Sequence, residues 1–198
     1  MDVSRALEQI AEIHQQIAKA EVYRGYRPVP VAASGLIGLT AAALQPHGLA
    51  AGDPLAFTVY WMTIAACAGL VGGIEILHHY VVDDDPAARR RTRQVVGQLL
   101  PSLAAGALIG AAAARLDGRL VPLLPGVWAL CFGVGIFASR PYLPRAAGWV
   151  AMFYAAAGAA LLWLAPPAGA GTGWWIGGTF GVGQLFAAAV LWRDLERI

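Results

Sequence analysis

The residues best suited to chemistry lie in one short run, GGIEILHHYVVDDD, at positions 72–85. Glu75 is an acidic residue inside an otherwise apolar stretch, and His78 and His79 follow it after three and four residues. On a helix this spacing brings both imidazoles within reach of the carboxylate. A charged side chain at the centre of a membrane costs about 2.5–3.5 kcal/mol on insertion scales, so such a residue indicates a function by default.

Three interpretations of Glu75 stay open. Together with a histidine it can relay protons or couple to a substrate, because the pKa of imidazole lies near neutrality. Glu-x-x-His is also a metal-ligand spacing in helix bundles, but the chain has no second such motif, so no metal site is predicted. The third interpretation is a structural ion pair with an arginine at the same membrane boundary, for which the candidates are Arg24, Arg27 and Arg140.

Two other polar sets are candidates for binding. Gln184 lies in an apolar stretch, and an amide in hydrocarbon needs a partner, so we group it with Glu75 as a candidate for ligand binding or proton coupling. The run VVDDDPAARRRTR at 81–93 is either a solvated loop that sets topology or a docking patch for an anionic ligand or lipid headgroup. Its cations are Arg89, Arg90, Arg91 and Arg93.

Recognisable catalytic patterns are absent from the sequence. It contains no Ser/His/Asp set, zincin helix, P-loop or dinucleotide fingerprint. Cys67 and Cys131 lie in apolar runs without metal-type spacing. We therefore predict no catalytic residue, no metal and no cofactor. The absence of such patterns does not decide whether the protein is an enzyme, but it argues against enzyme activity.

The composition indicates a membrane protein. Of 198 residues, 58% are hydrophobic and only 13% are charged, whereas soluble domains have about 25% charged residues. A net charge of +2 gives no reason to expect a nucleic-acid partner. We predict an all-α, polytopic bundle in which each span needs about 20 apolar residues. The six predicted spans are roughly 29–45, 55–77, 99–115, 120–138, 146–165 and 174–192.

The basic residues predict the orientation, because cytoplasmic segments of membrane proteins are enriched in Arg and Lys. With both termini in the cytoplasm, twelve of the fourteen fall inside, and only Arg115 and Arg119 fall outside. The twelve are Arg5, Lys19, Arg24, Arg27, Arg89, Arg90, Arg91, Arg93, Arg140, Arg145, Arg193 and Arg197. Since both termini lie on the same side, the number of spans must be even. We expect the membrane to be a bacterial-type inner membrane.

The spans resemble three tandem helical hairpins. Each hairpin begins with a proline (Pro30, Pro101, Pro144), and each return helix has a tryptophan before a glycine-rich face (Trp61, Trp128, Trp174). The clearest match is Phe-Gly-Val-Gly at 132–135 and again at 180–183. Three sets of small residues predict close helix contacts: Ala65, Gly69 and Gly73; Gly106 and Gly110; and Gly177 and Gly181. Trp61 and Trp128 are expected to pack between helices.

Residues 1–27 are predicted as a separate cytoplasmic unit, ahead of a transmembrane domain at 28–198. Residues 3–22 have the periodicity of an amphipathic helix. Positions 2–21 contain four acids and two bases, whereas helices that lie on anionic lipid are usually basic. We therefore expect this helix to dock on the bundle or to pair with a second copy or a membrane partner.

The functional prediction is correspondingly broad. We expect a small integral membrane protein that binds or transports a small molecule, ion or lipid through the helix bundle. The alternative is a non-catalytic membrane scaffold or regulatory subunit that engages a protein partner through residues 3–22.

Overall fold

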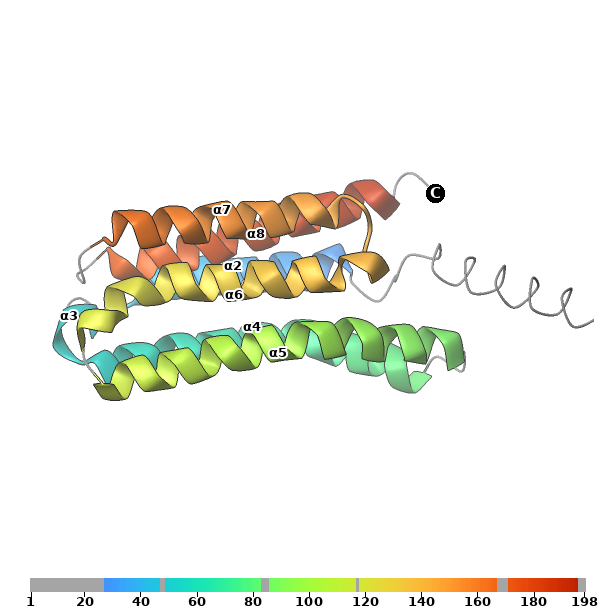
Figure 1. The fold of residues 1–198 in the computed structure, drawn as a ribbon. Helices are drawn as coiled ribbons and strands as arrows, with labels where there is room; N and C mark the ends of the chain where they lie inside the picture. The colour runs from blue at the N-terminus through green and yellow to red at the C-terminus, as the bar shows by residue number, and fades with distance from the viewer. Residues whose placement is uncertain (1–26, 47–48, 83–85, 117, 167–170, 196–198) are drawn as a thin grey trace, which may run out of the picture.

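The computed structural model describes residues 27–46, 49–82, 86–116, 118–166 and 171–195. Within these ranges all the regular structure is helical (Figure 1). The main helices are α2 (Pro28–Leu44), α4 (Pro54–Val82), α5 (Pro86–Leu116), α6 (Leu124–Ser139), α7 (Ala147–Leu164) and α8 (Thr172–Leu195). Short turns of helix connect them: α3 (Leu49–Gly52), η1 (Gly118–Leu123) and η2 (Arg140–Tyr142). The predicted helix at 3–22 lies outside the described residues.

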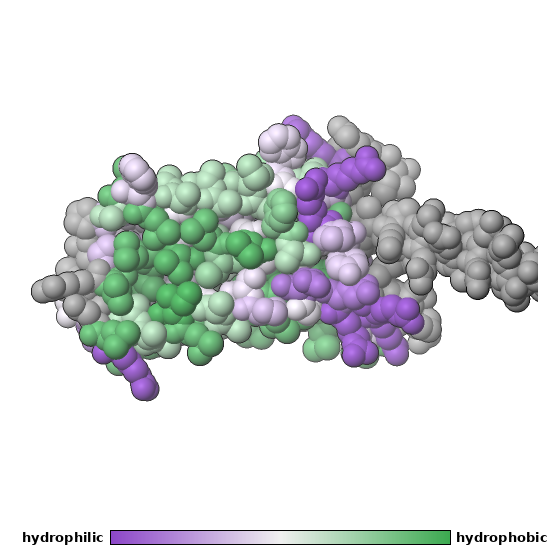
Figure 2. All heavy atoms as spheres, viewed as in Figure 1, coloured by the Kyte–Doolittle hydropathy of each residue, from purple (hydrophilic) through white to green (hydrophobic). Residues whose placement is uncertain are grey.

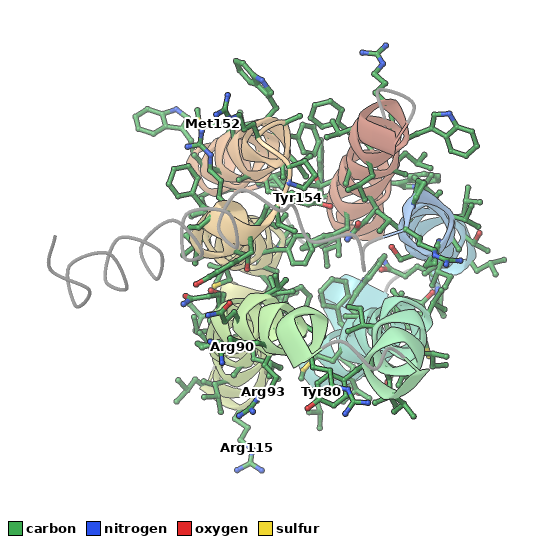
Figure 3. All side chains as sticks on the ribbon, turned by 90° about the vertical axis from the view of Figure 1, so that its right-hand side faces the viewer. Tyr80, Arg90, Arg93, Arg115, Met152 and Tyr154 are labelled. Atoms are coloured by element: carbon green, nitrogen blue, oxygen red, sulfur yellow. The ribbon has the colours of Figure 1, made fainter. Side chains whose placement is uncertain are left out.

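The six main helices of the described chain form a closed ring. Each packs on the next in chain order, and α8 returns to pack on α2, which is the most extensive of these contacts. Figure 3 looks along this ring from one end. Short connections force consecutive helices to be antiparallel neighbours. Consequently α2 begins and α8 ends at the same end of the bundle (Figure 1).

Five helices in the described part of the chain are long and apolar enough to cross a membrane. The candidate spans are Pro54–Ile74, Thr92–Leu116, Leu120–Tyr142, Ala147–Leu164 and Thr172–Arg193. The remaining helix, α2, is equally apolar but has only 17 residues, which is about 26 Å at 1.5 Å per residue. The hydrocarbon layer is about 30 Å thick. The bundle is therefore an all-helical apolar assembly, and the count of six spans is not confirmed.

Glycines hold α2 against α8. A Cβ on Gly35 would lie 2.9 Å from the carbonyl oxygen of Gly181, and a Cβ on Gly177 would overlap the carbonyl oxygen of Gly38. The two helices thus approach backbone to backbone at two levels, as small residues allow in membranes. The predicted close contact at Gly177 and Gly181 is confirmed.

The other two sets of small residues behave differently. Gly106 and Gly110 form a slot for the indole of Trp128, whose Nε1–H donates to the Gly106 carbonyl oxygen at 2.9 Å. A Cβ on Gly69 or Gly73 would meet nothing within 4 Å. The predicted contact along this face of α4 is therefore absent among the described residues, because α4 turns the face outward and its neighbours α2 and α5 lie on other sides.

The repeated Phe-Gly-Val-Gly motif occupies equivalent positions in α6 and α8. The first glycine of each motif contacts the next helix in the ring, since Gly133 meets α7 and Gly181 meets α2. The second contacts the preceding helix, since Gly135 meets α5 and Gly183 meets α7. The second and third hairpins therefore use the motif in the same way.

Aromatic side chains fill the ring between α6, α7 and α8. Tyr154 is fully buried, and its hydroxyl donates to the carbonyl oxygen of Phe180 at 3.2 Å. Its ring lies 4.8 Å from that of Phe132 and 5.4 Å from that of Phe180. In Figure 3 Tyr154 points into the bundle, whereas Met152 of the same helix points away from it.

Charge and apolar surface are separated along the bundle axis. Figure 2 shows hydrophobic side chains over much of one face and hydrophilic ones gathered at one end. We call this the arginine-rich end; the described arginines there are Arg27, Arg89, Arg90, Arg93, Arg140, Arg145 and Arg193, since α2 starts, α5 starts, α6 ends and α8 ends there. At the other end the side chain of Arg115 is the one described arginine.

Candidate functional site

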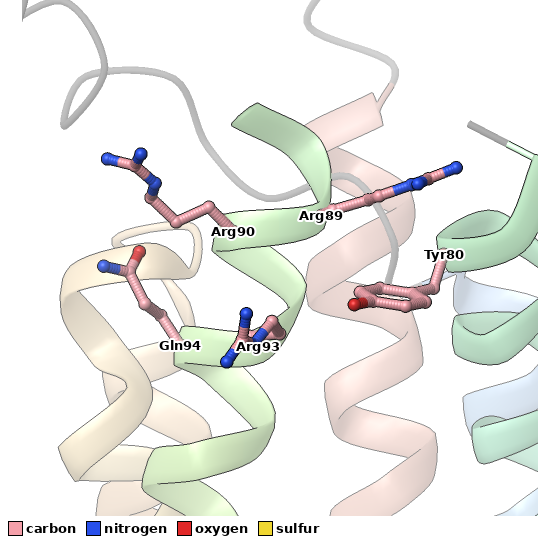
Figure 4. Close-up of a pocket in the computed structure, with 5 residues that line it drawn as sticks. All are labelled: Tyr80, Arg89, Arg90, Arg93 and Gln94. Carbon is pink, nitrogen blue, oxygen red and sulfur yellow. The ribbon is translucent and has the colours of Figure 1, made fainter. Parts of the chain in front are cut away.

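The described residues form an open cavity at the arginine-rich end, where α4 ends and α5 begins. Its volume is about 510 Å³, and it is lined by Tyr80, Arg89, Arg90, Arg93 and Gln94. In Figure 4 the ring of Tyr80 on α4 points toward Arg89 and Arg93, whereas the side chains of Arg90 and Gln94 extend from the other side of α5. Every one of these side chains has at least one hydrogen-bond donor.

The local sequence explains why the arginines gather here. Proline at the first position of α5 suits a helix start, because its missing N–H is not needed there. Thr92 and Val95 are buried, and the hydroxyl of Ser139 on α6 donates to the Val95 carbonyl oxygen at 3.3 Å. This anchors one face of α5 against α6. Arg90 and Arg93, three residues apart, consequently share an exposed face.

Arg89 connects the two walls of the cavity. Its guanidinium carbon lies 5.8 Å from the centre of the Tyr80 ring, which is a cation–π distance. The same side chain donates to the carbonyl oxygen of Val81 at 3.5 Å. Arg89 is half-buried and thus has a structural role beside any binding role.

The other two arginines of the cavity keep their donors available. Within the described part of the chain, Arg90 and Arg93 have no hydrogen bond or ion pair. Guanidinium groups stay protonated at every physiological pH. The acids of the connecting segment, residues 83–85, lie outside the described residues. The cavity therefore presents two cations that no described side chain neutralises.

The structure brings together three of the four predicted arginines. Arg89, Arg90 and Arg93 line the cavity, while Arg91 lies on α5 with a side chain outside the description. Tyr80 and Gln94 were missed by sequence reasoning. The only signal in the sequence was that they lie next to predicted site residues: Tyr80 follows the histidine pair, and Gln94 follows the last arginine of the run.

Glu75, His78 and His79 lie on the last turns of α4, just before Tyr80, and their side chains are outside the description. The candidate span Pro54–Ile74 ends just before Glu75, and because this span takes in described residues only, the predicted place of Glu75 inside a span stays a prediction. A carboxylate at this boundary is less costly than one at the membrane centre.

Gln184 belongs to a different part of the bundle. It is half-buried on α8, where a Cβ on Gly35 of α2 would lie 3.0 Å from the Gln184 Cβ. Gln184 is not among the residues that line the cavity. Its predicted grouping with Glu75 stays a prediction, because the Glu75 side chain lies outside the described residues.

No group of three or more His, Cys, Asp or Glu residues able to hold a metal is found among the described residues. Cys67 is exposed on α4 and Cys131 is half-buried on α6.

Comparisons with protein-family models, with curated proteins and with solved structures find no match for this chain. The fold and the site therefore define only a class. The helices and their apolar surface are compatible with an integral membrane protein that has a cationic cavity at one end.

Proposed function

We propose that this protein spans a bacterial-type inner membrane six times, with its arginine-rich end in the cytoplasm, and binds an anionic small molecule or lipid at that end. The observation that supports binding most directly is the cavity with two cations unneutralised by described residues, Arg90 and Arg93. The separation of the arginines from the apolar surface supports the proposed membrane insertion and the proposed orientation.

The packing of α2 supports a sixth span. Its glycine contacts with α8 occur at two levels, Gly35 with Gly181 and Gly38 with Gly177. Since α8 is a candidate span, α2 lies at the same depth. A helix of 17 residues is at the short limit for spanning, and a slightly thinner bilayer or tilted neighbours can accommodate it.

The distribution of arginines supports the orientation. Seven of the eight arginine side chains that the structure describes lie at one end, and the positive-inside rule places that end in the cytoplasm. Because α2 begins and α8 ends there, the segments that precede and follow them start on the cytoplasmic side.

Packing inside the ring favours binding at the end over passage through the centre. Tyr154, Phe132 and Phe180 fill the interior between α6, α7 and α8. A transported molecule would have to displace these rings. The proposal also includes transport coupled through Glu75, His78 and His79. These residues belong to α4, the helix that ends at the cavity.

Three measurements test the proposal. A reporter fused to the carboxyl end should be active only in the cytoplasm; periplasmic activity would contradict the orientation. The purified chain should bind anionic solutes more tightly than neutral analogues, and in proteoliposomes Glu75→Gln should abolish any uptake. Equal affinity for charged and neutral probes would contradict a cationic binding site.

A second candidate function is a scaffold or regulatory subunit that engages a protein through residues 3–22. One observation favours it: this net acidic segment leads into α2 at the arginine-rich end. Deleting residues 1–22 should then leave the bundle folded in detergent and remove a co-purifying partner or a homo-oligomer. An unchanged oligomeric state and partner profile would count against this function.

A further inference from the structure

We propose that the cavity between α4 and α5 binds a phosphate group, supplied by the headgroup of an anionic phospholipid. This inference rests on the proposed function, because it names the ligand of the same site. Free phosphate has the same chemistry, so the experiment below separates the two sources.

The lining of the cavity suits a phosphate in the number and kind of its donors. Arg90 and Arg93 each present a planar fork of N–H donors that matches phosphate oxygens bidentately. The amide of Gln94 and the hydroxyl of Tyr80 add neutral donors from two helices. No carboxylate is among the described lining residues, so no described side chain of the lining repels an anion. A phosphodiester has acceptor oxygens alone, and this lining complements it.

The size of the cavity favours a headgroup over a small ion. Its volume of about 510 Å³ lies in the range of ordinary ligand pockets, roughly 300–1,000 Å³. A single inorganic anion would leave most of this space to water. A phosphate with an attached glycerol fills more of it and keeps the contacts with both walls.

The depth of the cavity matches that of lipid phosphates. The candidate span of α5 starts at Thr92, so Arg90 and Arg93 flank its first residue. Lipid headgroups lie at this boundary, and basic pockets between transmembrane helices on the cytoplasmic side bind acidic headgroups.

Apolar surface continues from the cavity toward the membrane centre. On α5 the face of Arg93 is followed by Gly97, whose position is open, and by Leu100, which is 55% exposed. On α4 the turn before Tyr80 exposes Leu77, which is 60% exposed. A cationic pocket that opens onto an apolar face fits an amphiphile. Free phosphate would use only the polar half, so the geometry favours the lipid.

The test compares two double variants of the full-length protein. Arg90→Gln with Arg93→Gln removes the two cations of the cavity that no described side chain neutralises. Arg145→Gln with Arg193→Gln removes the same charge from exposed positions at the same end that do not line the cavity. Each protein is purified in a neutral detergent and titrated with phosphatidylglycerol or phosphatidylcholine, and bound lipid is counted by native mass spectrometry.

We expect phosphatidylglycerol to bind the unaltered protein at least about tenfold more tightly than phosphatidylcholine, because only the former has a net negative headgroup. The Arg90/Arg93 variant should lose about tenfold in affinity or more, and the Arg145/Arg193 variant less than about threefold. Equal losses in both variants would overturn the proposal, since the arginines would then act only as general surface charge.

Competition with soluble anions separates the phosphate sources and the two proposals. Glycerol phosphate or inorganic phosphate should displace the lipid only weakly; displacement as effective as by the lipid itself would overturn the lipid source. If phosphatidylglycerol fails but a carboxylate amphiphile binds through Arg90 and Arg93, the phosphate proposal fails and the proposed function stands. If no anionic probe depends on these arginines, both fail.

Discussion

The indole Nε1–H of Trp61 donates a hydrogen bond to Oε1 of Gln45, 2.8 Å away, and joins α4 to the end of α2. Both side chains are buried, with 3% and 8% of their surface exposed. The same indole also contacts the position of Gly177 on α8. One polar pair thus connects three helices of the ring at the end opposite the arginines.

Replacing Gln45 with leucine should destabilise the bundle by about 1–3 kcal/mol, because it leaves the buried indole N–H without an acceptor. Chemical unfolding in detergent measures this change. In a Trp61→Phe background the same replacement should cost clearly less, since no donor is left unpaired. Equal costs in both backgrounds would contradict the importance of the hydrogen bond.

Alanine at three glycines should give three different results. Gly177→Ala should destabilise by about 1–3 kcal/mol, because the new methyl overlaps the Gly38 carbonyl oxygen and the Ala42 Cβ. Gly38→Ala should be nearly neutral, since its nearest neighbour would be 3.6 Å away. Gly69→Ala should be neutral or stabilising by up to about 1 kcal/mol, because the position is open and alanine favours helices.

Thermal unfolding of the three variants in the same detergent tests this order. The change in Tm of Gly177→Ala should be the largest. Similar losses for Gly177→Ala and Gly69→Ala would show that α4 packs through Gly69 and that the open face is occupied.

The ring of Tyr154 should matter more than its hydroxyl. Tyr154→Phe removes a hydrogen bond to the Phe180 carbonyl oxygen and should cost about 0.5–1.5 kcal/mol. Tyr154→Ala empties the space between α6, α7 and α8 and should cost about 3–5 kcal/mol. Unfolding in denaturant measures both. A loss for Tyr154→Phe as large as that for Tyr154→Ala would contradict this division.

The outward face of α4 should contact lipid. Cys67 is exposed there, and a charged maleimide reacts only with a thiolate that water can reach. In proteoliposomes Cys67 should therefore stay unlabelled until a denaturing detergent is added. A cysteine introduced as Arg145→Cys, with both native cysteines replaced by serine, should label at once when its side is exposed. Rapid labelling of Cys67 would instead indicate a water-filled path beside α4.

Much of the architecture could be predicted from the sequence. Apolar stretches of span length and proline- or glycine-rich breaks predicted the main helices, and the burial of Trp61 and the packing of Trp128 between helices are confirmed. The Phe-Gly-Val-Gly repeat correctly marked equivalent positions in α6 and α8. These features depend on local composition and periodicity, which a single stretch of chain contains.

The sequence could not predict which neighbouring helix or side chain each small residue contacts. The same pattern of small residues contacts a backbone at Gly177 and an indole at Gly110, whereas at Gly69 no described residue lies within reach. Which of these occurs depends on the helix that the ring brings alongside. Likewise the arginine run predicted a cationic patch, but Tyr80 joins it only because α4 and α5 pack together.

The amino-acid sequence by itself determined the apolar helices, their order and the gathering of most described arginines at one end of the bundle, because hydrophobicity and charge act on each segment separately. The tertiary structure alone decided that α8 closes the ring on α2, that Gln184 lies apart from the arginines, and that Tyr80, Arg90 and Arg93 share one cavity. Those relationships depend on contacts between segments far apart in the chain, and such contacts exist only once the helices have packed.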